Sequence, residues 1–128
     1  MVHIGNSVLN VLLAAIWRTH LAHPKVDAWL AGRSLAVCPL SELGFLRISS
    51  HPKGPFRAAM ADSRALLSDF LRKRDCAFIS ADLPTLRSNA PGSETVTDCY
   101  LAYLAGQHGM MLATLDTRIQ HKAALLIG

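Results

Sequence analysis

The chain has 128 residues, 51% of them hydrophobic, which is enough for a single domain with one apolar core. Its 13 Lys and Arg residues outnumber 9 Asp and Glu, and the resulting net charge of +4 favours a polyanionic partner without identifying one. Cys38, Cys76 and Cys99 form no CxxC pair, which argues against a disulfide framework or a structural zinc site.

The first predicted elements are a buried strand and two helices. Residues 2–9 are expected to form the strand, residues 11–18 an apolar helix, and a second helix begins near Pro24 and stops at Gly32. The apolar stretch at residues 8–17 is far shorter than the roughly 20 residues that cross a bilayer, and no Lys or Arg precedes it as in a secretory signal. We therefore expect no membrane anchor and a cytoplasmic location.

The rest of the chain continues the alternation of strands and helices. In order, we predict a strand at 35–38, a helix from Pro39, a helix at 56–74, a strand at 76–80, a loop at 83–92, a helix at 97–107, and strands at 110–115 and 123–127. This pattern predicts a single α/β domain over residues 1–128. Its central sheet is expected to be mostly parallel, with four to five strands, and to be flanked by helices.

Three acidic residues follow predicted strands, namely Glu42, Asp98 and Asp116. In folds of this class the functional site lies beyond the carboxyl ends of the strands, so these side chains are expected to converge at one edge of the sheet. Clustered carboxylate oxygens are the ligands that hard divalent cations prefer. The arrangement suggests a metal-dependent nuclease.

Each acid also has a structural explanation. Asp98 completes a Thr95-x-x-Asp98 pattern that resembles a capping box, and Asp116 is suited to cap the turn after its strand. Glu42 lies on a helix that is apolar nearly all round, where an unpaired carboxylate would be costly, so it needs a partner such as Arg47 or a metal. That all three acids follow strands only as unrelated caps is less probable than that any single one of them does.

Several of these motifs together resemble the PIN-domain ribonucleases, and among them the VapC-type toxins. The similarity is carried by TDxxLA at residues 97–102, followed by Gly109 and by LATLD at residues 112–116. NVLLA at residues 10–14 and the pair of Glu42 and Arg47 extend it over nearly the whole chain. The resemblance implies a three-layer PIN-like fold.

The resemblance also implies a site and partners. Glu42, Asp98 and Asp116 would ligate Mg²⁺ or Mn²⁺, while Thr114 would support the ligands and Asn10 would orient the site from the first strand. The implied substrate is RNA, and the implied partners are a VapB-like antitoxin and a second copy of the chain in a homodimer. From their positions near this site, Arg47 and Arg87 are candidates for contacting a backbone phosphate.

One position departs from the family pattern. The first strand of these ribonucleases ends in Asp-x-Asn, but the residue two before Asn10 is Val8, and no Asp or Glu precedes Asp27. The alternative to a working nuclease is therefore a catalytically inactive PIN domain that binds RNA or protein. A phosphotransfer or phosphatase domain is a weaker interpretation, because its site too usually needs an aspartate at the end of the first strand. His20 and His23 are expected to be surface or packing residues rather than metal ligands, because no third ligand is in view.

Overall fold

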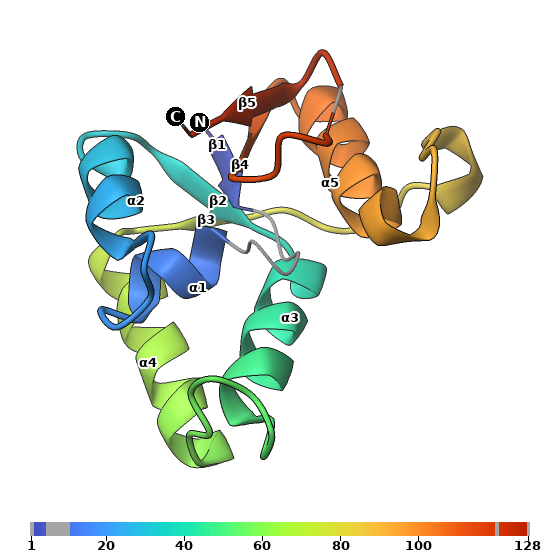
Figure 1. The fold of residues 1–128 in the computed structure, drawn as a ribbon. Coiled ribbons are helices and arrows are strands. Elements are labelled where there is room, and N and C mark those ends of the chain that lie inside the picture. Colours follow the sequence, from blue (N-terminus) through green and yellow to red (C-terminus); the bar gives the residue numbers. More distant parts are fainter. Residues whose placement is uncertain (1, 5–10, 120, 128) are drawn as a thin grey trace.

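The computed structural model describes residues 2–4, 11–119 and 121–127, and a parallel sheet runs through its centre (Figure 1). Its strands are β1 (Val2–Ile4), β2 (Leu35–Val37), β3 (Ala77–Phe78), β4 (Met111–Thr114) and β5 (Ala124–Leu126). They are arranged in the order β3-β2-β1-β4-β5, and every pairing is parallel. The prediction of a parallel α/β sheet is confirmed.

Helices cover both faces of this sheet. They are α1 (Val11–Ile16), α2 (His23–Leu30), α3 (Pro39–Ser50), α4 (Met60–Lys73) and α5 (Val96–Gln107), with short 3-10 helices η1 (Thr85–Arg87) and η2 (Ser93–Thr95). Successive residues of a strand point to opposite faces. Accordingly, Leu35 and Ala113 pack in the cluster formed by α1 to α4, whereas Ala36 and Leu112 pack against α5. The sheet is thus the middle of three layers, as Figure 1 shows.

The predicted helix at 56–74 begins four residues late, at Met60. Phe56 lies outside the helix, and its ring stacks on Trp17 with 4.6 Å between centroids and 7° between planes. Arg57 then takes a positive φ of 50°, which a right-handed helix does not allow. Packing of one aromatic ring therefore overrides the helical spacing of the sequence here.

Other boundaries differ less from the predictions. Gly109 has a φ of 70° between α5 and β4, the left-handed conformation that commonly ends a helix, as its place in the sequence predicts. The predicted loop at 83–92 contains η1. Of the predicted first strand, only Val2–Ile4 is among the described residues, and Val8 and Asn10 lie outside them. None of the described helices combines the length and apolar character needed to cross a membrane.

The strand order places a switch point between β1 and β4. From β1 the chain adds β2 and β3 on one side, and it then returns to add β4 and β5 on the other. Ligands of open parallel sheets bind beyond the carboxyl ends of the strands at such a point. The helix α5 packs on β1 and β4 and leads into the start of β4, so its own first turn lies at the same edge of the sheet.

Candidate functional site

Asp116 lies in the turn directly after β4 and is only 2% exposed. Its backbone N–H donates to the Thr114 hydroxyl over 3.0 Å, and its carboxylate oxygen Oδ1 accepts from the backbone N–H of Arg118 over 2.9 Å. The expected role of Asp116 as a cap of this turn is therefore confirmed. Thr114 supports the turn from the end of the strand.

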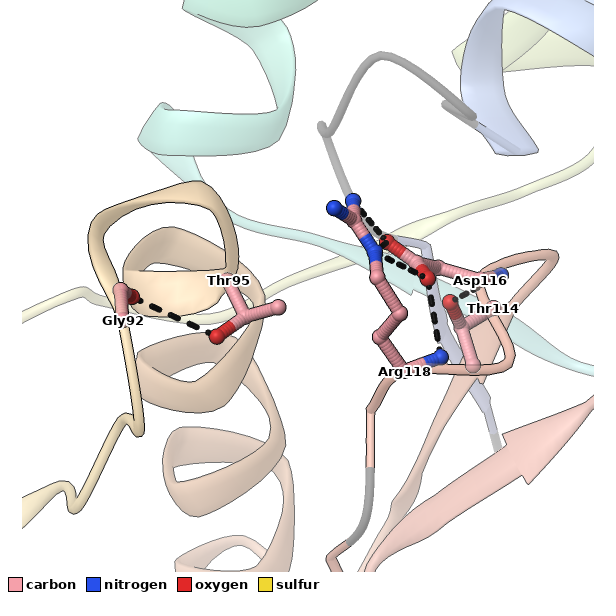
Figure 2. A network of polar contacts seen from close by, with 5 residues as sticks. All are labelled: Gly92, Thr95, Thr114, Asp116 and Arg118. Carbon is pink, nitrogen blue, oxygen red and sulfur yellow. Dashed lines mark hydrogen bonds and ion pairs between the residues drawn. The ribbon is translucent and has the colours of Figure 1, made fainter.

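A guanidinium group engages the same carboxylate (Figure 2). Arg118 Nε lies 3.0 Å from Oδ1 and 3.2 Å from Oδ2 of Asp116, and Nη2 lies 2.7 Å from Oδ2. The Arg118 side chain is 54% exposed, so one face of the ion pair meets solvent. These hydrogen bonds hold the pKa of Asp116 below its ordinary value despite burial. Sequence reasoning missed Arg118, although its position two residues after the acid was a usable signal.

Asp98 occupies the first turn of α5 and is 3% exposed. The Thr95 side chain makes no capping bond to the helix, so that half of the predicted capping box is not formed, whereas the predicted place of Asp98 in the first helical turn is confirmed. The Thr95 hydroxyl instead donates to the carbonyl of Gly92 over 3.4 Å, within the turn that precedes α5 (Figure 2). Asp98 and Glu94 both raise the pKa of Arg118, after the larger effect of Asp116. Three acidic side chains therefore contribute to the electrostatic environment of one guanidinium.

A cavity of about 720 Å³ opens beside Asp98. Its wall includes Thr97 and Asp98 from the start of α5, Glu94 of η2, and Arg47 of α3. The structure thus brings together Asp98 and one of the two predicted phosphate-binding arginines. Arg87, the other, is exposed on η1 and does not line this cavity. Glu94 was not predicted as a site residue, and only its closeness to Asp98 in the sequence could have suggested it.

Glu42 lies elsewhere, in the first turn of α3, where it is partly buried. It lines a second cavity, of about 510 Å³, together with Arg64 and Leu67 of α4, and Asp98 does not line that cavity. Arg47 forms no ion pair with it, since the ion pairs among the described residues are Asp69–Arg72 and Asp116–Arg118. The suggested Arg47 partner is therefore not observed. Burial raises the pKa of the Glu42 carboxyl group.

The donors can be compared with what a hard cation requires. Asp98 and Asp116 are buried carboxylates at the expected sheet edge, and this donor type suits Mg²⁺ or Mn²⁺. In the part of the chain that the structure describes, no three His, Cys, Asp or Glu side chains lie close enough to hold a metal ion. Arg118 also occupies both oxygens of Asp116. The donor type fits, but a metal would need to displace Arg118 and gain a further ligand.

The Asp116–Arg118 pair predicts a loss of stability in acid. The pKa of Asp116 is lower in the folded protein than in the unfolded chain, where it is about 3.9. The stabilisation is therefore complete above that value and is lost as the pH falls through the folded pKa. The test is urea unfolding at a series of pH values below about 5. We expect the free energy of unfolding to fall less steeply with decreasing pH in Asp116→Asn than in the unmodified chain. Equal slopes would contradict the pairing.

The substitution Glu42→Gln is expected to raise stability at neutral pH, whereas loss of the Asp116 charge lowers it. Because burial raises the pKa of Glu42, its ionised form opposes folding, and the opposition grows as the pH rises through the folded pKa. We expect the variant to unfold at a slightly higher temperature than the unmodified chain at pH 7. The difference should close below about pH 3.5, where the carboxyl group is largely protonated in both the folded and the unfolded state. A lower melting temperature at pH 7 would mean that Glu42 has a stabilising partner.

Comparison with known proteins places the chain among curated ribonucleases. It is 31% identical over 118 residues to ribonuclease VapC38 of Mycobacterium tuberculosis, an alignment that covers 87% of this chain and 84% of that protein. It is 33% identical over 120 residues to ribonuclease VapC44 and 27% identical over 127 residues to ribonuclease VapC39 of the same organism. The alignments cover 84% and 91% of those two proteins. No family model matches the chain. By its identity to these relatives over most of their length, the chain belongs to the VapC-type PIN-domain family of ribonucleases.

Proposed function

We propose that this chain is a metal-dependent endoribonuclease and the toxin of a toxin–antitoxin pair. The observation that carries the proposal is the pair of buried carboxylates, Asp98 and Asp116, at the switch point of a parallel sheet. Relatives that align over most of their length are named ribonucleases. Family membership and the position of the acids thus support the same chemistry.

In this proposal Asp98 and Asp116 hold Mg²⁺ or Mn²⁺, and Glu42, which lines a separate cavity in the structure, would have to move toward them to serve as a third ligand. The bound cation would supply an activated water and neutralise charge on the scissile phosphate. The residues of the chain have their own tasks. Thr114 fixes the turn that carries Asp116, and Arg47, on the cavity wall shared with Asp98, contacts a backbone phosphate of the RNA. Asn10 is proposed to orient the site from the first strand, and Arg87 to contact a more distant phosphate.

The partners are proposed on the same basis. A VapB-like antitoxin would cover the acidic site, and two copies of the chain would form a homodimer in the cytoplasm. The name VapC on the relatives supports the antitoxin. Size-exclusion chromatography with light scattering, with and without a co-expressed antitoxin, measures both associations directly.

The second candidate function is an inactive PIN domain that binds RNA or protein. Two observations favour it, namely Val8 at the position of the family's first aspartate and Arg118 on both oxygens of Asp116. Either feature would weaken metal binding. The nuclease cuts RNA, an inactive RNA-binding domain binds RNA without cutting it, and an inactive protein-binding domain does neither.

Val8→Asp distinguishes the two functions. The change supplies the carboxylate that the family pattern expects, so we expect Mn²⁺-dependent cleavage to rise by roughly tenfold or more, in line with the effect of groups around a metal site. Cleavage of labelled single-stranded RNA is measured with Mn²⁺ and with EDTA, and Val8→Asn is the control of similar size and no charge. Cleavage by the unmodified chain that EDTA stops supports the enzyme. RNA binding without cleavage, in both the unmodified chain and Val8→Asp, supports the binding module.

A further inference from the structure

The cavity beside Asp98 has the size and setting of a ligand site. Its volume of about 720 Å³ lies within the range of small-molecule sites. Leu13 of α1, Ile48 of α3, and Pro55 with Phe56 give it an apolar surface, and Asp98 forms part of its wall. Leu21 also lines it and is 99% exposed, so it adds apolar surface that solvent can reach. A ligand here would lie next to the proposed catalytic acid.

An aromatic ring that lines this cavity is fixed by a second ring stacked on it. Phe56 lines the cavity and stacks in parallel on Trp17, with ring centroids 4.6 Å apart. The Trp17 indole N–H donates to the hydroxyl of Ser49 over 2.9 Å, and Ser49 is fully buried in α3. The ring of Phe56 is therefore positioned before any ligand arrives. Proteins that bind single-stranded RNA stack its unpaired bases on such aromatic rings.

Polar groups on the wall match the edges of a base and its phosphate. The Nδ1 atom of His20 accepts the backbone N–H of Ala22 over 3.0 Å, which assigns the ring proton of the neutral imidazole to Nε2. Burial, and then the nearby His23, lower the pKa of His20 and favour this neutral form. His20 thus offers a hydrogen-bond donor, Glu94 offers acceptors, and Arg47 offers a cation for phosphate.

We propose that this cavity is a nucleobase subsite, in which one unpaired base of the RNA substrate stacks on Phe56 while its phosphate contacts Arg47. The inference rests on the proposed ribonuclease function and adds to it the place where sequence is read. Apolar walls with charges of both signs suit a base joined to a phosphate better than an apolar peptide, which would leave Arg47 and Glu94 facing carbon. His20 and Glu94 are the residues that select the base.

The test is equilibrium binding of short labelled rA, rC, rG and rU oligonucleotides in EDTA, where no cleavage occurs. We expect Phe56→Leu to weaken binding of the preferred homopolymer by about tenfold, as loss of one stacked base does, and to reduce the difference among the four. Phe78→Leu is the matched control, because Phe78 is 58% exposed on β3 and does not line the cavity. It should bind all four like the unmodified chain.

Two further measurements test the subsite without relying on the Phe56→Leu variant, which could bind RNA weakly only because it is misfolded. Arg47→Gln should weaken binding of all four homopolymers by a similar factor and reduce the dependence on salt, since it removes only a phosphate contact. In the variant Trp29→Phe, which keeps Trp17 as its single tryptophan, RNA should change the fluorescence of Trp17, because that ring stacks on Phe56.

The possible outcomes distinguish a failure of the proposed nucleobase subsite from a failure of the proposed ribonuclease function. If Phe56→Leu keeps the affinities and base preference of the unmodified chain, the subsite is wrong while Mn²⁺-dependent cleavage can still support the nuclease. If Phe56→Leu loses affinity for the antitoxin but not for RNA, the cavity is a protein-docking site and the subsite is also wrong. If the unmodified chain neither binds nor cuts RNA, the proposed function itself fails.

Discussion

RNA cleavage by Asp98→Asn is expected to fall at least about 100-fold below that of the unmodified chain, since removing even a residue that supports a metal ligand costs 10- to 100-fold. Asparagine keeps the shape of the side chain but replaces a carboxylate oxygen with an amide nitrogen, which does not bind a hard cation. Asp98 is 3% exposed, in the first turn of α5. The measurement is the initial rate of cleavage with saturating Mn²⁺.

The control for this variant is Asp27→Asn, which removes the same charge from an exposed position on α2. It should cleave like the unmodified chain. Melting curves of both variants verify that they are folded under the assay conditions. A folded Asp98→Asn protein that retains a tenth or more of the activity would remove Asp98 from the proposed site.

Replacing Arg118 with glutamine is expected to tighten Mn²⁺ binding by about 10- to 100-fold. The guanidinium occupies both oxygens of Asp116, so a metal must displace it to reach the carboxylate, and groups that contact a metal ligand typically change metal affinity by about 10- to 100-fold. In metal-free buffer the same variant should be less stable, because Asp116 is left buried without its cation. Added Mn²⁺ should restore its melting temperature.

The affinity is measured by calorimetric titration, which does not depend on cleavage. Arg72→Gln is the matched control, since Arg72 belongs to an exposed ion pair with Asp69 on α4 and the change removes the same charge. It should leave Mn²⁺ affinity unchanged. Arg118→Lys keeps the charge but not the bidentate contact with Asp116. The Mn²⁺ affinity of this variant should therefore lie between those of Arg118→Gln and the unmodified chain. Equal affinities in all four proteins would show that Arg118 and the metal do not compete.

The sequence predicted most of the fold because its signals are local. Gly109 ends α5, Pro39 opens α3, and short apolar runs gave β2 and β4 within a residue or two. The start of α4 was missed because Phe56 leaves the helical pattern to stack on Trp17, a residue 39 positions away in the sequence. Spacing rules do not include such a contact.

The site was less predictable than the fold. Asp98 and Asp116 were placed at the correct edge of the sheet, because parallel strands align their carboxyl ends. The sequence did not reveal that Arg118 turns back onto Asp116, or that Glu42 lines a different cavity from Asp98. Both depend on side-chain directions within turns, which the pattern of residue types does not encode.

The position of β1 at the middle of the sheet has a consequence for synthesis. Val2 pairs with Leu35 on one side, but its partner on the other side is Met111, near the opposite end of the chain. A nascent chain can therefore form the first pairing early, whereas the edge of β1 that faces β4 stays open until almost all residues have been translated. Because Asp116 follows β4, the acids meet only after that step. The site that Asp98 and Asp116 form at this edge of the sheet is therefore assembled only when nearly the whole chain has been synthesised.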